Sequence, residues 1–124
     1  MLLNEQLISE VGNKILKEAV TEADLDAVFQ AFENICTSDD ILLFTLKDYT
    51  KSFQFVFDEY SYGIVFEKGV CKTLKGAVQF PDVTYWIHKE VALDIINGRV
   101  YSAVAHMNGD VDYIGYKDGA IRKF

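Results

Sequence analysis

The sequence is poor in the residues that mark several large classes of protein. It has one proline, two cysteines, two histidines and one tryptophan, and no apolar run is long enough to span a bilayer. Residues 2–5 do not resemble a secretory signal peptide. We therefore expect no stable membrane insertion and a cytoplasmic protein in which Cys36 and Cys71 are reduced, buried thiols. A disulfide or redox pair is the alternative for these two cysteines.

Basic residues are scarce in the first third of the chain. The formal net charge is −7, and residues 1–40 alone contain nine acidic and two basic residues, whereas residues 41–124 contain ten of each. An acidic surface repels the phosphates of nucleic acids and anionic lipid headgroups. We expect no nucleic-acid partner and no strong electrostatic docking to membranes, and we interpret the acidic excess as a solvated helical surface.

The usual sequence signatures of catalysis and cofactor binding are also missing. There is no Gly-x-Ser-x-Gly motif and no glycine-rich phosphate loop. Neither His88 nor His106 has a second histidine or cysteine at the spacing of metal ligands. We therefore expect no cofactor, no metal and no enzymatic activity. The weaker alternative is an acyl-handling enzyme that uses Cys71 or His106.

Length and composition indicate one domain with a substantial core. We divide it into N-terminal helices over residues 1–50 and a sheet with C-terminal helices over residues 51–124. Half of the residues are hydrophobic and 14% are aromatic, which excludes a disordered chain. The spacing predicts a first helix near residues 4–19 with one apolar face, made of Ile8, Val11, Ile15 and Ala19.

Two capping signals predict where the next helices begin. Thr21 followed by Asp24 resembles a capping box, with aspartate in place of the preferred glutamate or glutamine. The helix that it opens has a broad apolar stripe, made of Leu25, Val28, Phe29, Phe32 and Ile35. Residues 38–40 supply a cap for a third segment over residues 41–49. This segment favours a helix, although its short apolar run also fits a strand.

From residue 52 the hydrophobic period changes to two, which indicates strands. Alternation predicts two strands, joined by a turn at residues 59–61, whose apolar positions are Phe53, Phe55, Phe57, Tyr62, Ile64 and Phe66. Lys68-Gly69 predicts a hairpin turn into a weaker strand at residues 70–78, in which Gly76 indicates a bulge or an early end. Pro81 starts a fourth strand, and residues 111–114 form the fifth. We expect an α+β fold with a five-stranded, mostly antiparallel sheet covered on one face by helices.

Residues 80–116 contain two short helices between two strands, and a glycine ends each helix. Apolar residues at helical spacing precede Asn97-Gly98, and a second such set precedes Asn108-Gly109. Asp82-Val83-Thr84 opens the first strand, Glu90 lies in the first helical turn, and Gly115 ends the second strand. In this order and spacing, without a gap from residue 82 to residue 115, the segment resembles the sterol carrier protein type 2 family.

The resemblance implies a hydrophobic tunnel that binds fatty acyl chains, sterols or phospholipids. The residue pattern by itself leaves two interiors open: a cavity, because small side chains on the short helices lie opposite large aromatic side chains of the sheet, or a space filled to normal density by phenylalanine and leucine side chains. The resemblance favours the cavity. We expect the sheet wall to be formed by Phe55, Phe57, Phe66, Tyr85 and Ile87. We expect the helical wall to be formed by Ile95, Ile96, Val100, Val104 and Met107. Three further residues are candidate polar contacts for a ligand: Tyr101, His106 and Tyr113.

We therefore predict that the chain binds, and carries, a hydrophobic small molecule or lipid. The alternative is a ligand-free module of the same fold whose interior is filled to normal density and which serves in protein interaction or dimerisation. Trp86 is predicted to lie on the sheet face opposite to that of Tyr85 and Ile87. A homodimer through that face, and cover of Trp86 by an N-terminal helix, are both compatible with its position.

Overall fold

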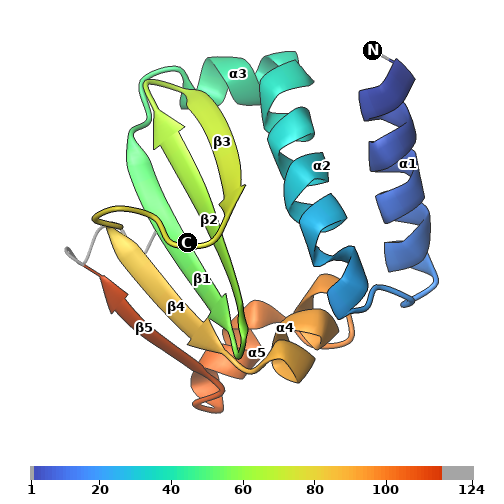
Figure 1. Cartoon of the computed structure of the whole chain (residues 1–124), viewed down its shortest axis with the longest axis vertical. Helices are drawn as coiled ribbons and strands as arrows, with labels where there is room; N and C mark the ends of the chain where they lie inside the picture. Colours follow the sequence, from blue (N-terminus) through green and yellow to red (C-terminus); the bar gives the residue numbers. More distant parts are fainter. Residues whose placement is uncertain (1, 116–124) are drawn as a thin grey trace.

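Five strands form one sheet, and the helices lie on one of its faces (Figure 1). The computed structural model describes residues 2–115, with side chains from residue 5 onward. The strands are β1 (Lys51–Phe57), β2 (Tyr60–Glu67), β3 (Val70–Lys75), β4 (Val83–Ile87) and β5 (Val111–Gly115), in the order β3-β2-β1-β4-β5. Only β1 and β4 pair in parallel; the other three pairings are antiparallel. The predicted α+β class and the mostly antiparallel sheet are thus confirmed.

Three α-helices and one 3₁₀ turn precede the sheet in the chain. They are α1 (Leu2–Leu16), the 3₁₀ turn η1 (Glu22–Asp24), α2 (Leu25–Ser38) and α3 (Asp40–Leu46). Helix α2 packs against the sheet, and α1 packs on the side of α2 that faces away from it (Figure 1). The two remaining helices, α4 (Lys89–Ile96) and α5 (Ser102–Met107), follow β4 and close the lower end of the layer between α2 and the sheet (Figure 1).

The first helix is shorter than its apolar spacing predicts. It ends at Leu16, and Glu18 adopts a positive φ of 52°, which turns the chain out of the helix. Ala19, which we expected on the apolar face of this helix, therefore lies beyond its end and is exposed. Val20 is buried in its place, with 4% of its surface exposed.

The two predicted capping signals are both present. The Asp24 carboxylate accepts a hydrogen bond from the Thr21 N–H at 3.0 Å, which forms the predicted capping box around η1 before α2 begins. The Asp39 carboxylate accepts one from the Leu42 N–H at 3.0 Å, as the N-cap of α3. Because this cap satisfies an otherwise free donor, the ambiguous apolar run after residue 40 folds as a helix, as we predicted.

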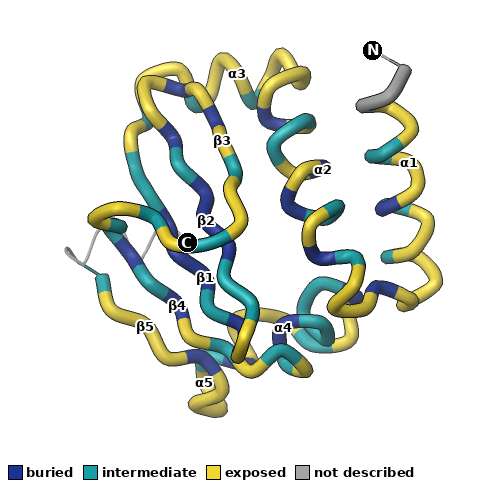
Figure 2. The backbone as a smooth tube through the Cα atoms, in the orientation of Figure 1, coloured by how far each residue is buried: buried dark blue, intermediate teal, exposed yellow. Residues whose placement is uncertain are grey.

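The alternation of the strands separates the two faces of the sheet. Paired positions of β1, β2 and β4 direct one set of side chains toward the helices, where they form the core: Phe53, Phe55, Phe57, Tyr62, Ile64, Phe66, Val83 and Tyr85. Figure 2 shows these strands with buried positions along their length, whereas β5 and α5 are largely exposed. The core therefore lies between the sheet and α2, and it thins toward α5.

Two sequence-based boundaries need correction, and a third, which the sequence left open, is decided by the structure. The turn between β1 and β2 lies at Asp58 and Glu59, because Asp58 adopts a φ of 56° and Tyr60 already pairs with Phe57. Strand β3 ends at Lys75, immediately before Gly76 with a φ of 115°, which is the early end that this glycine indicated as one of two alternatives. Strand β4 starts at Val83, so Pro81 lies in the bend before it.

The connection from β3 to β4 crosses the sheet face that carries no helix (Figure 1). Gln54, which is buried on that face, fixes the crossing segment: its amide nitrogen donates to the Gly76 carbonyl at 3.0 Å, and its amide oxygen accepts from the Val78 N–H. A Cβ atom at Gly63 would lie 2.2 Å from Val78 Cγ2, so only glycine permits this close approach. The crossing returns the chain to the start of β4, beside β1.

Candidate functional site

A cavity of about 630 Å³ lies between α2, the sheet and the two short helices α4 and α5. Its sheet wall is formed by side chains on the helix-covered face: Phe55, Phe57, Ile64, Tyr85, Ile87, Val111 and Tyr113. Aromatic rings dominate this wall, and the rings of Phe55 and Tyr85 stack with their centroids 5.5 Å apart. The volume falls within the range of sites that bind small molecules.

Helix α2 forms the second wall through Val28, Phe29 and Phe32. The Phe29 ring stacks on the ring of Tyr62 at 4.5 Å, which anchors this wall to strand β2. The Tyr62 hydroxyl in turn donates a hydrogen bond to the Asp26 carboxylate at the start of α2. Phe32 is 39% exposed, so this wall is in part in contact with solvent.

The third wall consists of α4 and α5. It is lined by Ala92, Ile95, Ile96, Ser102, Ala103 and His106. The small side chains at residues 92 and 103 leave the space that larger residues would fill, as their position opposite aromatic side chains predicts. Among residues 5–115, no lysine, arginine, aspartate or glutamate lines the cavity. Its polar side chains are those of Tyr85, Tyr113, Ser102 and His106.

The two helices of this wall are held unequally. The start of α4 is capped by the Asp58 carboxylate of the β1–β2 turn, which accepts from the Lys89 N–H at 3.0 Å and lies 2.9 Å from His88 Nδ1. These contacts lower the pKa of Asp58, chiefly through the Lys89 N–H, and the carboxylate raises the pKa of His88. Helix α5 is six residues long, and Ala105 is its single buried residue.

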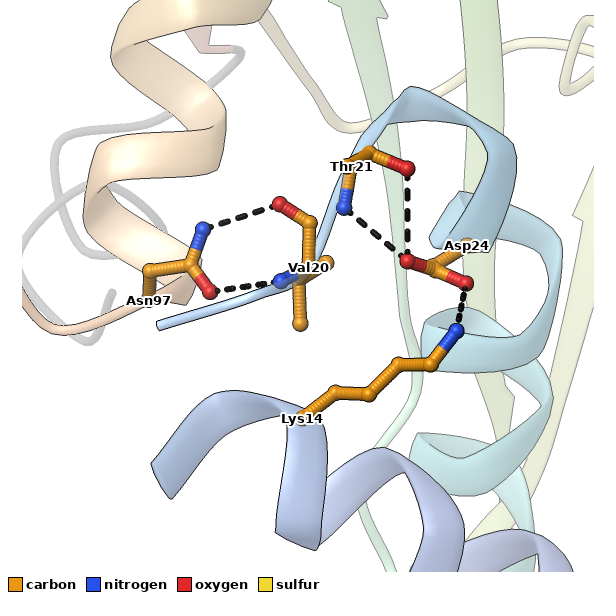
Figure 3. Close-up of polar contacts among 5 residues, drawn as sticks. All are labelled: Lys14, Val20, Thr21, Asp24 and Asn97. Carbon is orange, nitrogen blue, oxygen red and sulfur yellow. Dashed lines mark hydrogen bonds and ion pairs between the residues drawn. The ribbon is translucent and has the colours of Figure 1, made fainter. Parts of the chain in front are cut away.

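The end of α4 is joined to the segment that follows α1 (Figure 3). The buried Asn97 side chain accepts from the Val20 N–H and donates to the Val20 carbonyl, both at 3.0 Å. Beyond Val20, the Asp24 carboxylate binds the Lys14 ammonium of α1, which lowers the pKa of Asp24. Helix α4 is therefore fixed at both ends, whereas α5 is the less constrained part of the cavity wall.

The structure brings most of the sequence-predicted site residues together around this cavity. Eight of them are among its lining residues: Phe55, Phe57, Tyr85, Ile87, Ile95, Ile96, His106 and Tyr113. Phe66 is buried in the core outside the lining, in edge contact with Phe53 and Tyr49. Val100 is half-buried and packs against the core cluster outside the lining.

Three predicted residues on the outer side of α5 do not reach the cavity. Tyr101 is 82% exposed, Met107 is 86% exposed and Val104 is 43% exposed. A helix of two turns with apolar residues on every side does not reveal from its sequence which side is buried. Ala103 and His106 of the same helix face the cavity instead.

The α2 wall and several small residues were absent from the predicted site. The sequence does show that the apolar stripe of α2 is broad. That breadth indicates more than one packing surface, and the structure has three of them: α2 packs on α1, on the sheet and along the cavity. Ser102 and Val111 carried no such signal. Their place in the cavity depends on how α5 and β5 meet β4 in three dimensions.

The two cysteines lie away from the cavity. Cys36 of α2 and Cys71 of β3 are both buried in the core and neither forms a disulfide. Burial, with the Cys36 thiol nearby as a smaller contribution, raises the pKa of Cys71 to about 12. A thiol with such a pKa is a poor nucleophile near neutral pH, because the thiolate is the reactive form.

Trp86 lies on the helix-free face of the sheet, paired in register with Val56. Its side chain is 40% exposed and borders a shallow hollow shared with Asp112 and His88. The N-terminal helices cover the opposite face (Figure 1). Trp86 is therefore not covered by them.

No family model matches the sequence, and no curated protein matches it. Solved structures do match its fold. Palmitated sterol carrier protein 2-like 2 from Aedes aegypti superposes with a TM-score of 0.58 over 73% of this chain and 81% of that protein, at 19% sequence identity. Apo sterol carrier protein 2 from Yarrowia lipolytica matches with a TM-score of 0.59 over 77% of this chain and 89% of that protein, at 12% identity. The chain has the sterol carrier protein 2 fold.

The same sterol carrier fold occurs within a larger enzyme. The inverting sec-alkylsulfatase Pisa1 from a Pseudomonas species matches with a TM-score of 0.61 over 85% of this chain, at 18% identity. The present chain spans 16% of the length of that sulfatase.

Within residues 2–115, each helix of the chain is too short or too polar to cross a membrane.

Proposed function

We propose that this protein binds one single-chain lipid in the cavity beneath α4 and α5, and that it acts as a carrier rather than as an enzyme. The observation that carries the proposal is the cavity itself: about 630 Å³ of space lined mostly by apolar side chains. Transfer of apolar surface from water into such a space stabilises a complex by about 25 cal/mol per Å². The Aedes aegypti protein of the same fold is described with palmitate, which supports an acyl chain as the ligand.

The size of the cavity favours one chain over two. If a methylene group takes up about as much room as a water molecule, roughly 30 Å³, the space accommodates roughly twenty non-hydrogen atoms. An acyl chain of sixteen carbons with a small head group fits that number. A phospholipid with two acyl chains has more than twice as many atoms and is therefore disfavoured. Phospholipids and sterols are to be tested as competitors of the single-chain lipid.

The unequal support of the two helices suggests the route of entry. Each helix has one buried residue, Ala92 in α4 and Ala105 in α5. Helix α4 is also fixed by Asp58 at its start and by Asn97 at its end, and four of its partly buried side chains pack against the core: Val91, Leu93, Ile95 and Ile96. Displacement of α5 costs fewer buried contacts than displacement of α4, and weakly held elements are the ones that open. Ligand exchange is therefore proposed to occur beneath α5.

The proposal is tested by filling the cavity from its edge. Ala103 is exposed at its surface side yet lines the cavity, so Ala103→Trp introduces an indole into the ligand space without replacing a core residue. Met107→Trp adds the same indole on the solvent side of the same helix and is the matched control. After delipidation, we expect wild type and Met107→Trp to bind a fluorescent fatty acid with micromolar affinity, and Ala103→Trp to lose at least tenfold.

Two results would contradict the carrier proposal. One is the absence of fluorescence change and of any lipid adduct in native mass spectrometry after the delipidated protein is reloaded. The other is equal binding by Ala103→Trp and Met107→Trp, which would place the ligand elsewhere. An acyl-handling enzyme is less well supported, since Cys71, one of its two candidate residues, is remote from the cavity and has a raised pKa.

A further inference from the structure

The polar side chains of the cavity gather on one side of it. Tyr85 of β4 and Tyr113 of β5 flank His106 of α5: the His106 ring lies 5.4 Å from the Tyr113 ring and 6.2 Å from the Tyr85 ring, in edge contacts. Ser102 lies one helical turn before His106 and lines the same wall. The opposite wall, on α2, is formed by valine and phenylalanine. The cavity is thus amphipathic, with a polar end near α5.

Hydrogen-bonding groups at this end are available to a ligand. Within residues 5–115, the side chains of Ser102, His106 and Tyr113 make no hydrogen bond to another group of the protein. Tyr113 is 42% exposed and His106 is half-buried, so this end is also where the cavity meets solvent. An imidazole and a phenol can each donate or accept a hydrogen bond, which suits a hydroxyl, ester or amide group.

The charges of the protein disfavour an anionic ligand at the same place. Among the described residues, no cation lines the cavity, and the chain carries a net charge of −7. A carboxylate at the polar end would lose part of its hydration without meeting a lysine or arginine of residues 5–115, which is unfavourable. It would also be repelled by the negative potential of the protein.

We propose that the preferred ligand is a single-chain lipid with an uncharged polar head, such as a long-chain alcohol or a monoacyl ester, whose head hydrogen-bonds to His106 and Tyr113. This inference rests on the proposed function, and it assigns the chemical class of the ligand and the end of the cavity that holds its head. A fatty acid of the same chain length would still enter the cavity but would bind more weakly than the uncharged lipid.

The test compares two ligands of equal chain length, 1-hexadecanol and palmitate, at pH 8. Each is delivered from methyl-β-cyclodextrin to delipidated protein, and binding is followed by displacement of the neutral dye Nile red. We expect 1-hexadecanol to bind at least tenfold more tightly than palmitate. Replacing both hydrogen-bonding groups, His106→Phe with Tyr113→Phe, is expected to weaken 1-hexadecanol by about tenfold and to leave palmitate nearly unchanged. Tyr101→Phe, on the exposed side of the helix start, is the control and is expected to change neither.

The outcomes separate this inference from the proposed function. If palmitate binds as tightly as 1-hexadecanol or more tightly, the cavity is a lipid site but the assigned head-group class is wrong. If neither ligand displaces the dye, the carrier proposal fails and this inference fails with it. If the double variant keeps the wild-type preference, His106 and Tyr113 do not hold the head. Should the double variant melt at a much lower temperature, Tyr113→Phe alone, at an exposed position, gives the same comparison.

Discussion

Asn97 makes two backbone hydrogen bonds that the segment between α1 and η1 cannot make within itself. Its side chain pairs with both the N–H and the carbonyl of Val20, 77 residues earlier in the chain. Only 4% of each residue is exposed, so water cannot replace these bonds. A single amide side chain thereby ties the end of α4 to the N-terminal helices.

Asn97→Ala is therefore expected to destabilise the fold. It leaves a buried N–H and a buried carbonyl without partners, and each such group costs about 1–3 kcal/mol, so the loss is about 3 kcal/mol. Asn108, at the corresponding C-cap of α5, is exposed and makes no side-chain hydrogen bond among the described residues. Asn108→Ala is expected to cost under about 1 kcal/mol. Urea unfolding of both variants checks this; equal losses would show that the bonds to Val20 contribute little.

At the scale of elements, the sheet presents two unlike faces. The helix side is covered by α2, α4 and α5, whereas the other face, as far as residues 2–115 are concerned, is crossed by the segment between β3 and β4 (Figure 1). That open face carries Trp86 at 40% exposure and Ile114 at 69% exposure. Exposed apolar side chains on neighbouring strands are typical of a surface that meets a partner.

We expect a second copy of the chain to cover this face. A lysine in place of Trp86 would bring two like charges into a symmetric interface, because the same patch occurs on both subunits. Sedimentation velocity is expected to show a dimer for the wild type and a monomer for Trp86→Lys. A wild type that sediments as a monomer, unchanged by the substitution, would remove the interface and leave the carrier proposal intact.

The helices and strands could be predicted from the sequence far better than the contacts between them. Alternation in β1, β2 and β4 and the caps at Thr21 and Asp39 are local signals, so the helices, the strands and the inward face of the sheet followed from them. The contribution of α2 to the cavity did not follow, because an apolar stripe does not say which element covers it. Likewise, Gln54 finds its partners 22 and 24 residues away, at Gly76 and Val78, and no local pattern encodes such contacts.

The predicted site shows the same limit. Residues on the sheet wall reached the cavity because a strand has two distinguishable faces, whereas Val104 and Met107 on α5 did not. In a helix of six residues, tertiary contacts decide which side is buried. Ala105 is the one buried residue of α5, and Val104 and Met107 lie on the exposed side of this helix.

At the scale of the whole molecule, the account depends on a cavity of limited volume between the sheet and the helices. Alcohols of increasing chain length, titrated into delipidated protein, measure that limit directly. Each added methylene that enters the cavity contributes about 0.8 kcal/mol, or roughly a fourfold gain in affinity. We predict such a gain up to roughly sixteen to eighteen carbons, where the space is filled, followed by no further increase. An affinity that does not depend on chain length would contradict the cavity as the binding site. So would an affinity that keeps rising by the same factor per methylene far beyond eighteen carbons.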